Sequence, residues 1–154
     1  MKRLTSVALI VLFALLLFGA STTTAQKKMK AEAVMMPTES MKWEEMKGGP
    51  PGVTYCNVWG DMGKGAYGAF IKLPPNLNNP LHSHSNDTKV VVVAGSFYMA
   101  DESGKQTVMG PGSYFMEPGW MKHTSGTKEQ GATLFQQSTG KFDFNMAETP
   151  KEKK

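Results

Sequence analysis

The segment Pro80-Leu81-His82-Ser83-His84 carries two histidines at a spacing of two residues. Successive side chains of a strand point to opposite faces, so His82 and His84 can face the same cavity if the segment is extended. The chain holds three histidines, and the third, His123, lies well downstream. An extended pair at this spacing can chelate a metal ion, and a small β-barrel could bring His123 to the same ion. We therefore expect the fold and the function to depend on these three residues.

The sequence from Gly48 onward consists of short β-rich runs separated by glycine and proline, with no long amphipathic helix between them. This texture is typical of an antiparallel barrel or sandwich, so we predict an all-β domain. Strands are predicted at Val53–Trp59, Ala66–Leu73, Pro80–His84, Lys89–Ala94, Ser96–Ala100, Gln106–Met109, Ser113–Met116, Lys122–Ser125, Thr133–Ser138 and Phe142–Phe144. The run of four valines at 90–93 lacks alternation, which favours a strand covered on both faces.

The first 25 residues resemble a secretory signal peptide. Lys2 and Arg3 supply a positive start, an apolar run follows, and small residues precede a cleavage site expected after Ala25. The apolar run is shorter than the roughly 20 residues of a membrane-spanning helix, so we favour a cleaved signal over an anchor. The predicted domains are a signal peptide (1–25), a flexible polar and Met-rich lead-in (26–47) with a turn of helix around 40–46, a barrel (48–147) and a charged tail (148–154). A bacterial exported protein, periplasmic or secreted, is the expectation.

Charge and cysteine content narrow the function classes. The chain has 17 basic and 13 acidic residues, and removal of Lys2 and Arg3 with the signal leaves 15 against 13, a net charge of +2. Such a balanced surface gives no electrostatic reason to expect binding to nucleic acid or stable membrane association after signal cleavage. Cys56 is the one cysteine, which excludes an internal disulfide.

Three imidazole ligands suit several divalent transition metals, and the sequence does not distinguish zinc, iron, manganese, copper and nickel. Three protein ligands leave at least one coordination position for water or substrate, as in a catalytic or sensing site. Two further carboxylates could approach such a site. Glu117, which lies just before Pro118, could support a metal ligand or transfer protons there, although we expect a solvated rim residue. Asp87 could reach the metal from a loop.

Two separated motifs in the sequence resemble those of the cupins. The first is His82-Ser83-His84 followed after a short stretch by a strand that ends at Gly95, and the second is Gly112, Pro118 and His123 at the cupin spacing. Many cupins place a metal-binding Glu in the first motif, where this chain has Lys89 or, if the strand is one residue shorter, Thr88. The resemblance covers residues 53–140. Among the cupins, the chain most resembles small secreted single-domain proteins that are similar to the cupin domain of the anti-sigma factor ChrR.

The resemblance implies a double-stranded β-helix, or jelly-roll barrel, with a divalent transition metal on His82, His84 and His123. It also implies a small-molecule ligand or substrate, and a homodimer is compatible with it. Three possibilities stay open at this point. One is a metal-dependent small-molecule enzyme, an oxygenase, isomerase or lyase, and another is a non-catalytic metal- or ligand-binding or sensing module. The third is a metal-free barrel with a vestigial site. No catalytic residue is assigned.

Overall fold

The computed structural model describes residues 32–147. Its folded unit begins at Met35. The predicted signal peptide (1–25), the start of the lead-in and the charged tail (148–154) lie outside the described residues. Within the part that is described, no helix is long and apolar enough to cross a membrane.

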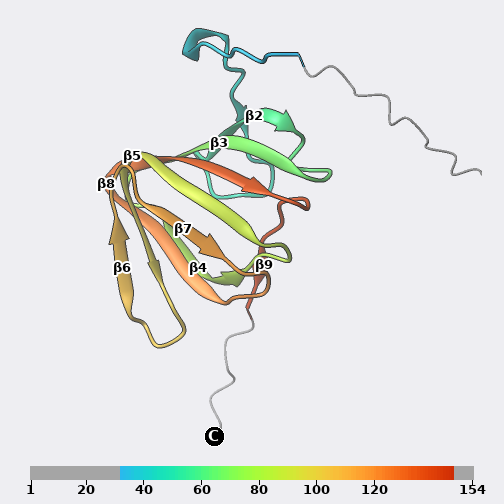
Figure 1. Cartoon of the computed structure of the whole chain (residues 1–154). Helices are drawn as coiled ribbons and strands as arrows, with labels where there is room; N and C mark the ends of the chain where they lie inside the picture. The colour runs from blue at the N-terminus through green and yellow to red at the C-terminus, as the bar shows by residue number, and fades with distance from the viewer. Residues whose placement is uncertain (1–31, 148–154) are drawn as a thin grey trace, which may run out of the picture. The chain divides into compact units, whose positions relative to one another are not determined.

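The described chain is built almost entirely of strands, as the glycine- and proline-punctuated sequence predicts (Figure 1). A single turn of 3-10 helix, η1 (Thr38–Ser40), precedes them. The strands are β1 (Glu44–Glu45), β2 (Thr54–Gly60), β3 (Tyr67–Leu73), β4 (Asn78–Ser83), β5 (Thr88–Ala100), β6 (Gln106–Met109), β7 (Tyr114–Glu117), β8 (His123–Ser138) and β9 (Asn145–Met146).

All strand pairs are antiparallel, and β5 and β8 hold the sheet together. β8 pairs with β3, β4 and β5, while β5 also pairs with β6 and β7. The sequence predicts two strands in place of each of these long elements. Gly95 and Gly131 have φ angles of +76° and +65°, and the β5 register shifts next to Gly95. Each long strand therefore bends at its glycine without losing its pairing. One continuous strand can then pair with different neighbours on the two sides of the bend.

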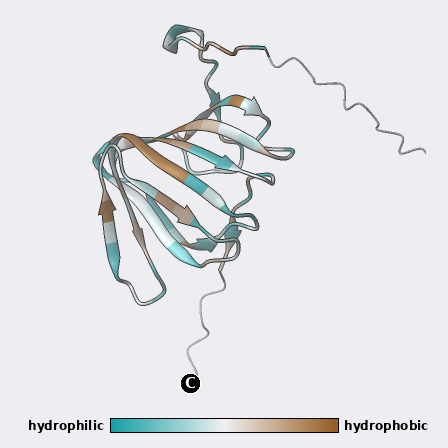
Figure 2. Cartoon of the chain, viewed as in Figure 1, coloured by the Kyte–Doolittle hydropathy of each residue, from teal (hydrophilic) through white to brown (hydrophobic). Residues whose placement is uncertain are grey.

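The four valines of β5 alternate between the interior and the surface. Val90 and Val92 are buried, whereas Val91 and Val93 are 37% and 46% exposed. The expectation of a strand covered on both faces is therefore wrong for the described residues. An unbroken β-branched run satisfies strand propensity at every position and so conceals the alternation of burial. Figure 2 shows β5 as a strongly hydrophobic stretch of the sheet.

The inner face of the sheet carries the core. One buried cluster gathers around Tyr67 and Ile71 of β3, and a second joins Val92 of β5 to Leu134 of β8 and Phe97. The ends of the chain differ from the predicted elements. The lead-in contains η1 and a two-residue strand, β1, that pairs with β2, instead of a helical turn around 40–46. The last strand is Asn145–Met146 and not Phe142–Phe144.

We expect Gly95→Ala to destabilise the protein far more than Gly104→Ala. Both glycines have positive φ, so each substitution costs about 1–2 kcal/mol of backbone strain. A Cβ at Gly95 would also overlap the carbonyl oxygen of Gly131, whereas a Cβ at Gly104 would meet no atom within 4 Å. Urea denaturation should give a loss of at least about 3 kcal/mol for Gly95→Ala and about 1 kcal/mol for Gly104→Ala. Equal losses would show that the β5–β8 bend tolerates a side chain.

Candidate metal centre

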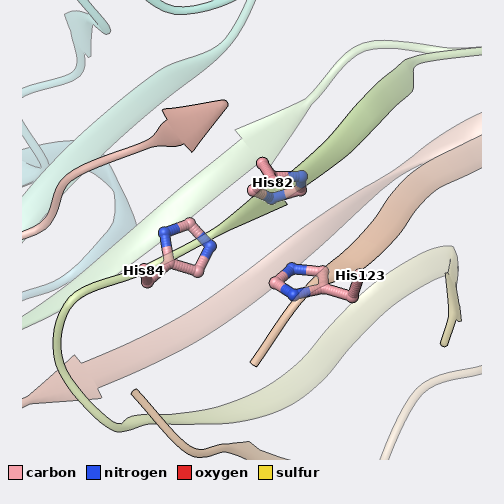
Figure 3. A group of neighbouring side chains, drawn as sticks. All are labelled: His82, His84 and His123. Atoms are coloured by element: carbon pink, nitrogen blue, oxygen red, sulfur yellow. The ribbon is translucent and has the colours of Figure 1, made fainter. Parts of the chain in front are cut away.

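The three histidines meet between two neighbouring strands. His82 lies on β4 and is paired in register with His123, the first residue of β8. His84 follows directly after the end of β4 at Ser83 and shares the face of His82, as the alternation of side chains predicts. One potential ligand atom from each ring lies within 4.8 Å of the others, and the rings gather around one point (Figure 3).

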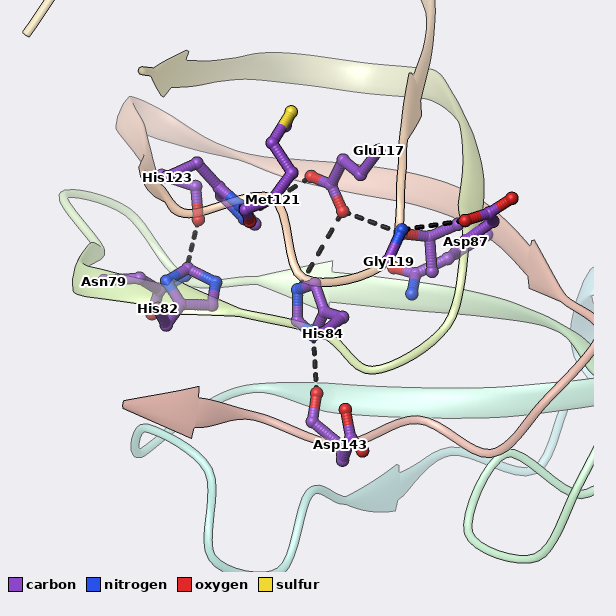
Figure 4. Close-up of polar contacts among 12 residues, drawn as sticks. Asn79, His82, His84, Asp87, Glu117, Gly119, Met121, His123 and Asp143 are labelled. Carbon is purple, nitrogen blue, oxygen red and sulfur yellow. Dashed lines mark hydrogen bonds and ion pairs between the residues drawn. The ribbon is translucent and has the colours of Figure 1, made fainter. Parts of the chain in front are cut away.

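A backbone carbonyl fixes the orientation of each ring. The Nδ1 atom of His82 lies 2.7 Å from the carbonyl oxygen of Pro80, and that of His123 lies 3.0 Å from the carbonyl oxygen of Met121. The Nδ1 atom of His84 contacts the carbonyl oxygen of Asp143 (Figure 4). A carbonyl can only accept, so each Nδ1 carries the hydrogen and each neutral ring keeps its Nε2 lone pair free. Histidines that bind metals are oriented in the same way.

Burial keeps His82 neutral. Its residue is 1% exposed, and this burial lowers the pKa of His82 to about 4. The nearby His123 and His84 also lower it, while the hydrogen bond to Pro80 acts in the opposite direction. A neutral imidazole at pH 7 is the form that binds a metal, so no proton has to be removed from His82 first.

Glu117 supplies a carboxylate to the same point. It is 5% exposed, with Oε1 3.5 Å from Nε2 of His123 and Oε2 3.9 Å from Nε2 of His84. The expectation of a solvated rim residue is therefore wrong. The signal was present in the alternation of β7, because Glu117 shares the inner face with Phe115 while Tyr114 and Met116 are exposed.

Thr88, not Lys89, occupies the inward position of the first motif. Thr88 is 2% exposed, whereas Lys89 points to the surface. Thr88 is the register partner of Glu117, and its hydroxyl donates a 2.8 Å hydrogen bond to Oε2 of Glu117. β5 thus presents no carboxylate at this position, and the neighbouring strand β7 presents one to the same interior.

The segment 142–146 encloses the histidines on another side. Phe144 stacks on the ring of His82 with centroids 3.9 Å apart and planes 11° from parallel. Asp143 accepts a 2.8 Å hydrogen bond from the backbone N–H of Ser85 through Oδ1, in addition to its carbonyl contact with His84. Burial raises the pKa of Asp143, but the hydrogen bonds from Ser85 and the charges of His84 and Lys141 together lower it overall. β9 then pairs with β4 at His82 and Ser83, so this segment holds the ligands in place.

Asp87 does not reach the site. Its Oδ1 accepts a 2.7 Å hydrogen bond from the N–H of Gly119, and the N–H of Trp120 donates to the carbonyl oxygen of His84. Asp87 thereby ties the loop before β8 to the loop after β4. It helps to position His123 and His84 through the backbone, and it is not a ligand from the loop as the sequence had suggested (Figure 4).

A cavity of about 70 Å³ lies beside the histidines. Its walls are mostly apolar and include Leu73, Leu77, Val90, Phe97, Phe115 and Leu134. Polar groups are few: the three histidines, Glu117, Asn79, Ser125 and Gln136. A few convergent polar groups in an apolar cavity are typical of a small-molecule site.

The comparisons with known proteins identify the fold. The chain is similar to the polyketide cyclase RemF from Streptomyces resistomycificus, with 17% identity, a TM-score of 0.62 and coverage of 80% of this chain and 89% of the cyclase. It is similar to an RmlC-like cupin from Ralstonia eutropha (18%, TM-score 0.60, coverage 75% and 78%) and to KdgF from Halomonas sp. (18%, TM-score 0.55, coverage 69% and 94%). The predicted cupin fold is therefore confirmed.

Two sequence comparisons complete this picture. A family model described as "Domain of unknown function (DUF4437)" matches residues 22–145. The comparison with curated proteins found no match.

We expect Thr88→Val to weaken metal binding about tenfold and Lys89→Ala to leave it unchanged. The valine keeps the shape of Thr88 but removes the hydrogen bond that holds Glu117, and loss of such a supporting contact typically costs 10–100-fold in metal affinity. Lys89 is exposed and points away from the histidines. Titration of both variants with zinc against a competing chelator measures the effect. A loss of affinity in Lys89→Ala alone would place the inward position one residue later.

Proposed function

Since the chain belongs to the DUF4437 family and has the cupin fold, we propose that it holds a divalent transition metal and acts as a metal-dependent enzyme on a small molecule. His82, His84 and His123 would bind the ion through Nε2, and Glu117 would complete the set with its carboxylate. An ion held in this way acts as a Lewis acid that polarises an oxygen of the substrate. The similar RemF structure is that of a polyketide cyclase, which agrees with a small-molecule enzyme on this fold.

The buried carboxylate of Glu117 carries the proposal. A carboxylate removed from water is costly unless a positive charge or several hydrogen bonds compensate it. Among the described residues, no Lys or Arg forms an ion pair with Glu117, and its polar neighbours are Thr88 and two imidazoles. The Nε2 lone pairs of the three histidines and the carboxylate of Glu117 surround one point and have no cation between them. A divalent metal ion is the group that such a set of donors binds.

The spacing of the donors supports the same conclusion. The distances of 3.5 and 3.9 Å between Glu117 and the two Nε2 atoms exceed those of hydrogen bonds. Ligand atoms about 2.0–2.2 Å from a shared metal lie roughly 3–3.5 Å apart. Because the ligand atoms of the three histidines lie within 4.8 Å of one another, an ion would draw the three rings as well as Glu117 closer together.

A non-catalytic binding module is the second candidate, and one observation favours it. Glu117 is the one carboxylate that lines the cavity. If Glu117 binds the metal, the polar groups left in the cavity wall are the side chains of Asn79, Ser125 and Gln136. None of these exchanges protons readily near pH 7. An enzyme would then rely on the metal and on the substrate's own groups. Turnover of any small molecule by the metal-loaded protein, lost in His123→Ala, separates the two candidates.

Export remains part of the proposal, and it rests on residues 1–25 alone. The positive start, the apolar run and the small residues before Ala25 support a cleaved signal. We expect the protein recovered from the periplasm or medium of a bacterial host to begin at Gln26, which intact-protein mass spectrometry measures. Recovery of the uncleaved chain in the membrane fraction would favour an anchor instead.

We expect His82→Ala and His123→Ala to lose stoichiometric metal and Glu117→Gln to bind it about 10–100-fold more weakly. The glutamine preserves the shape of Glu117 but removes its negative charge, so the effect on affinity reports on the charge. Elemental analysis of protein purified without chelator or His tag gives the metal content, and competition with a chelator gives the affinity.

The matched control is Glu129→Gln, which removes a carboxylate from the exposed surface of β8 and should leave both quantities unchanged. Wild-type protein should also gain thermal stability as the metal concentration rises above the dissociation constant. Equal metal content in the wild type and in His82→Ala would contradict the metal centre.

A further inference from the structure

Asn79 leaves a polar atom without a partner beside the three histidines. Among buried side-chain nitrogen and oxygen atoms of residues 32–147, its Oδ1 is the one that has no hydrogen-bond partner. Buried polar groups nearly always have a partner, because the loss of hydration is otherwise uncompensated. Asn79 also lines the cavity, so a group held in the cavity is a candidate for the missing donor.

The strands place this amide next to the metal centre. Asn79 is the register partner of Ser125 and His82 is the partner of His123, with a β-bulge in β4 between the two pairs, so that three residues along β4 match two along β8. Along β8, Ser125 is two residues from His123, which corresponds to about 6.7 Å. The Nδ2 of Asn79 donates a 3.1 Å hydrogen bond to Oγ of Ser125 and holds the amide in place. The amide of Asn79 is thus held on the same two strands as His82 and His123, beyond the bulge.

The walls between these two points are apolar. Leu77, Phe97 and Leu134 belong to the same cavity, and its lining includes no Lys, Arg or Asp. Apart from the metal centre, nothing in the lining would pair with an ionic group of a ligand. The cavity volume of about 70 Å³ is smaller than a 150 Å³ cavity known to hold benzene, so the part of a ligand enclosed here is short.

We propose that Asn79 accepts a hydrogen bond from the far end of the ligand that binds the metal. The ligand class is a short molecule with a metal-binding oxygen or sulfur at one end, an apolar spacer, and an uncharged O–H or N–H donor at the other. This inference rests on the proposed metal centre, because the metal fixes the first end. Asn79 is then a specificity-determining residue, since a ligand without the donor leaves Oδ1 desolvated and unpaired.

Two thiol probes of equal chain length test the assignment. Mercaptopropanol and butanethiol differ in one terminal group, a hydroxyl in place of a methyl, and each thiolate gives an absorption band when it binds cobalt(II). The full mature protein loaded with cobalt(II) is titrated with each probe, and the ratio of the two dissociation constants gives the preference for the hydroxyl. The same ratio is measured for Asn79→Leu, so differences in probe hydrophobicity cancel between wild type and variant.

We expect the preference for the hydroxyl probe to fall about two- to tenfold in Asn79→Leu, the range of a single neutral hydrogen bond. Asn78→Leu is the matched control, because Asn78 is the exposed neighbour on the same strand and should leave the ratio unchanged. Shorter and longer probe pairs locate the best spacer length. If Asn79→Leu does not fold, Asn79→Ala removes the same acceptor with less added volume and carries the same expectation.

The possible results distinguish a failure of the role proposed for Asn79 from a failure of the proposed metal centre. Cobalt(II) that binds with an unchanged ratio in the Asn79 variants overturns the role of Asn79 and leaves the metal centre intact. Failure of the wild type to bind cobalt(II), zinc or any other divalent transition metal overturns the metal centre and, with it, the ligand geometry assigned to Asn79. A reduced ratio in the Asn78 control as well would show a general effect on β4 and would also overturn the specific role.

Discussion

The pairing of β4 with β8 is the constraint on which the site depends. It sets His82 opposite His123 and, beyond a β-bulge in β4, Asn79 opposite Ser125. Side chains alternate along a strand, so a shift of one residue in this register would turn His123 to the face opposite His82 and separate both residue pairs. β8 holds its position because it also pairs with β3 and β5 over most of its length. β8 therefore fixes the relative positions of His82 and His123, which are far apart in the sequence.

The same logic explains how the chain manages without a Glu in its first motif. Residues directly opposite each other on antiparallel strands face the same side. Thr88 and Glu117 form such a pair, so the carboxylate of β7 faces the same interior as Thr88 of β5. The hydroxyl of Thr88 donates a hydrogen bond to that carboxylate and orients it. The negative charge that the first motif lacks is thus present on the neighbouring strand.

The sequence predicts what is local and misses what depends on register. The all-β class and the shared face of His82 and His84 follow from local patterns in the sequence, and the cupin motifs are identified by their resemblance to a known family. The burial of Glu117, the stacking of Phe144 on His82 and the unpaired amide of Asn79 depend on which residues become neighbours across strands. The valine run of β5 misleads for a related reason, since identical residues carry no information on which face is covered. Long strands bent at Gly95 and Gly131 look like separate strands when read one segment at a time.

The charge balance of the centre constrains what can bind there. A divalent ion bound by three neutral imidazoles and one carboxylate, as we propose, would keep a net charge of +1 inside a largely apolar cavity. An isolated charge in such surroundings is costly, and a ligand that brings one negative charge to the metal removes that cost. The rest of the ligand faces Leu77 and Phe97, where a second charge would lie unpaired. A short, singly charged molecule with a neutral polar end would therefore fit both the charge of the proposed metal site and the unpaired Oδ1 of Asn79.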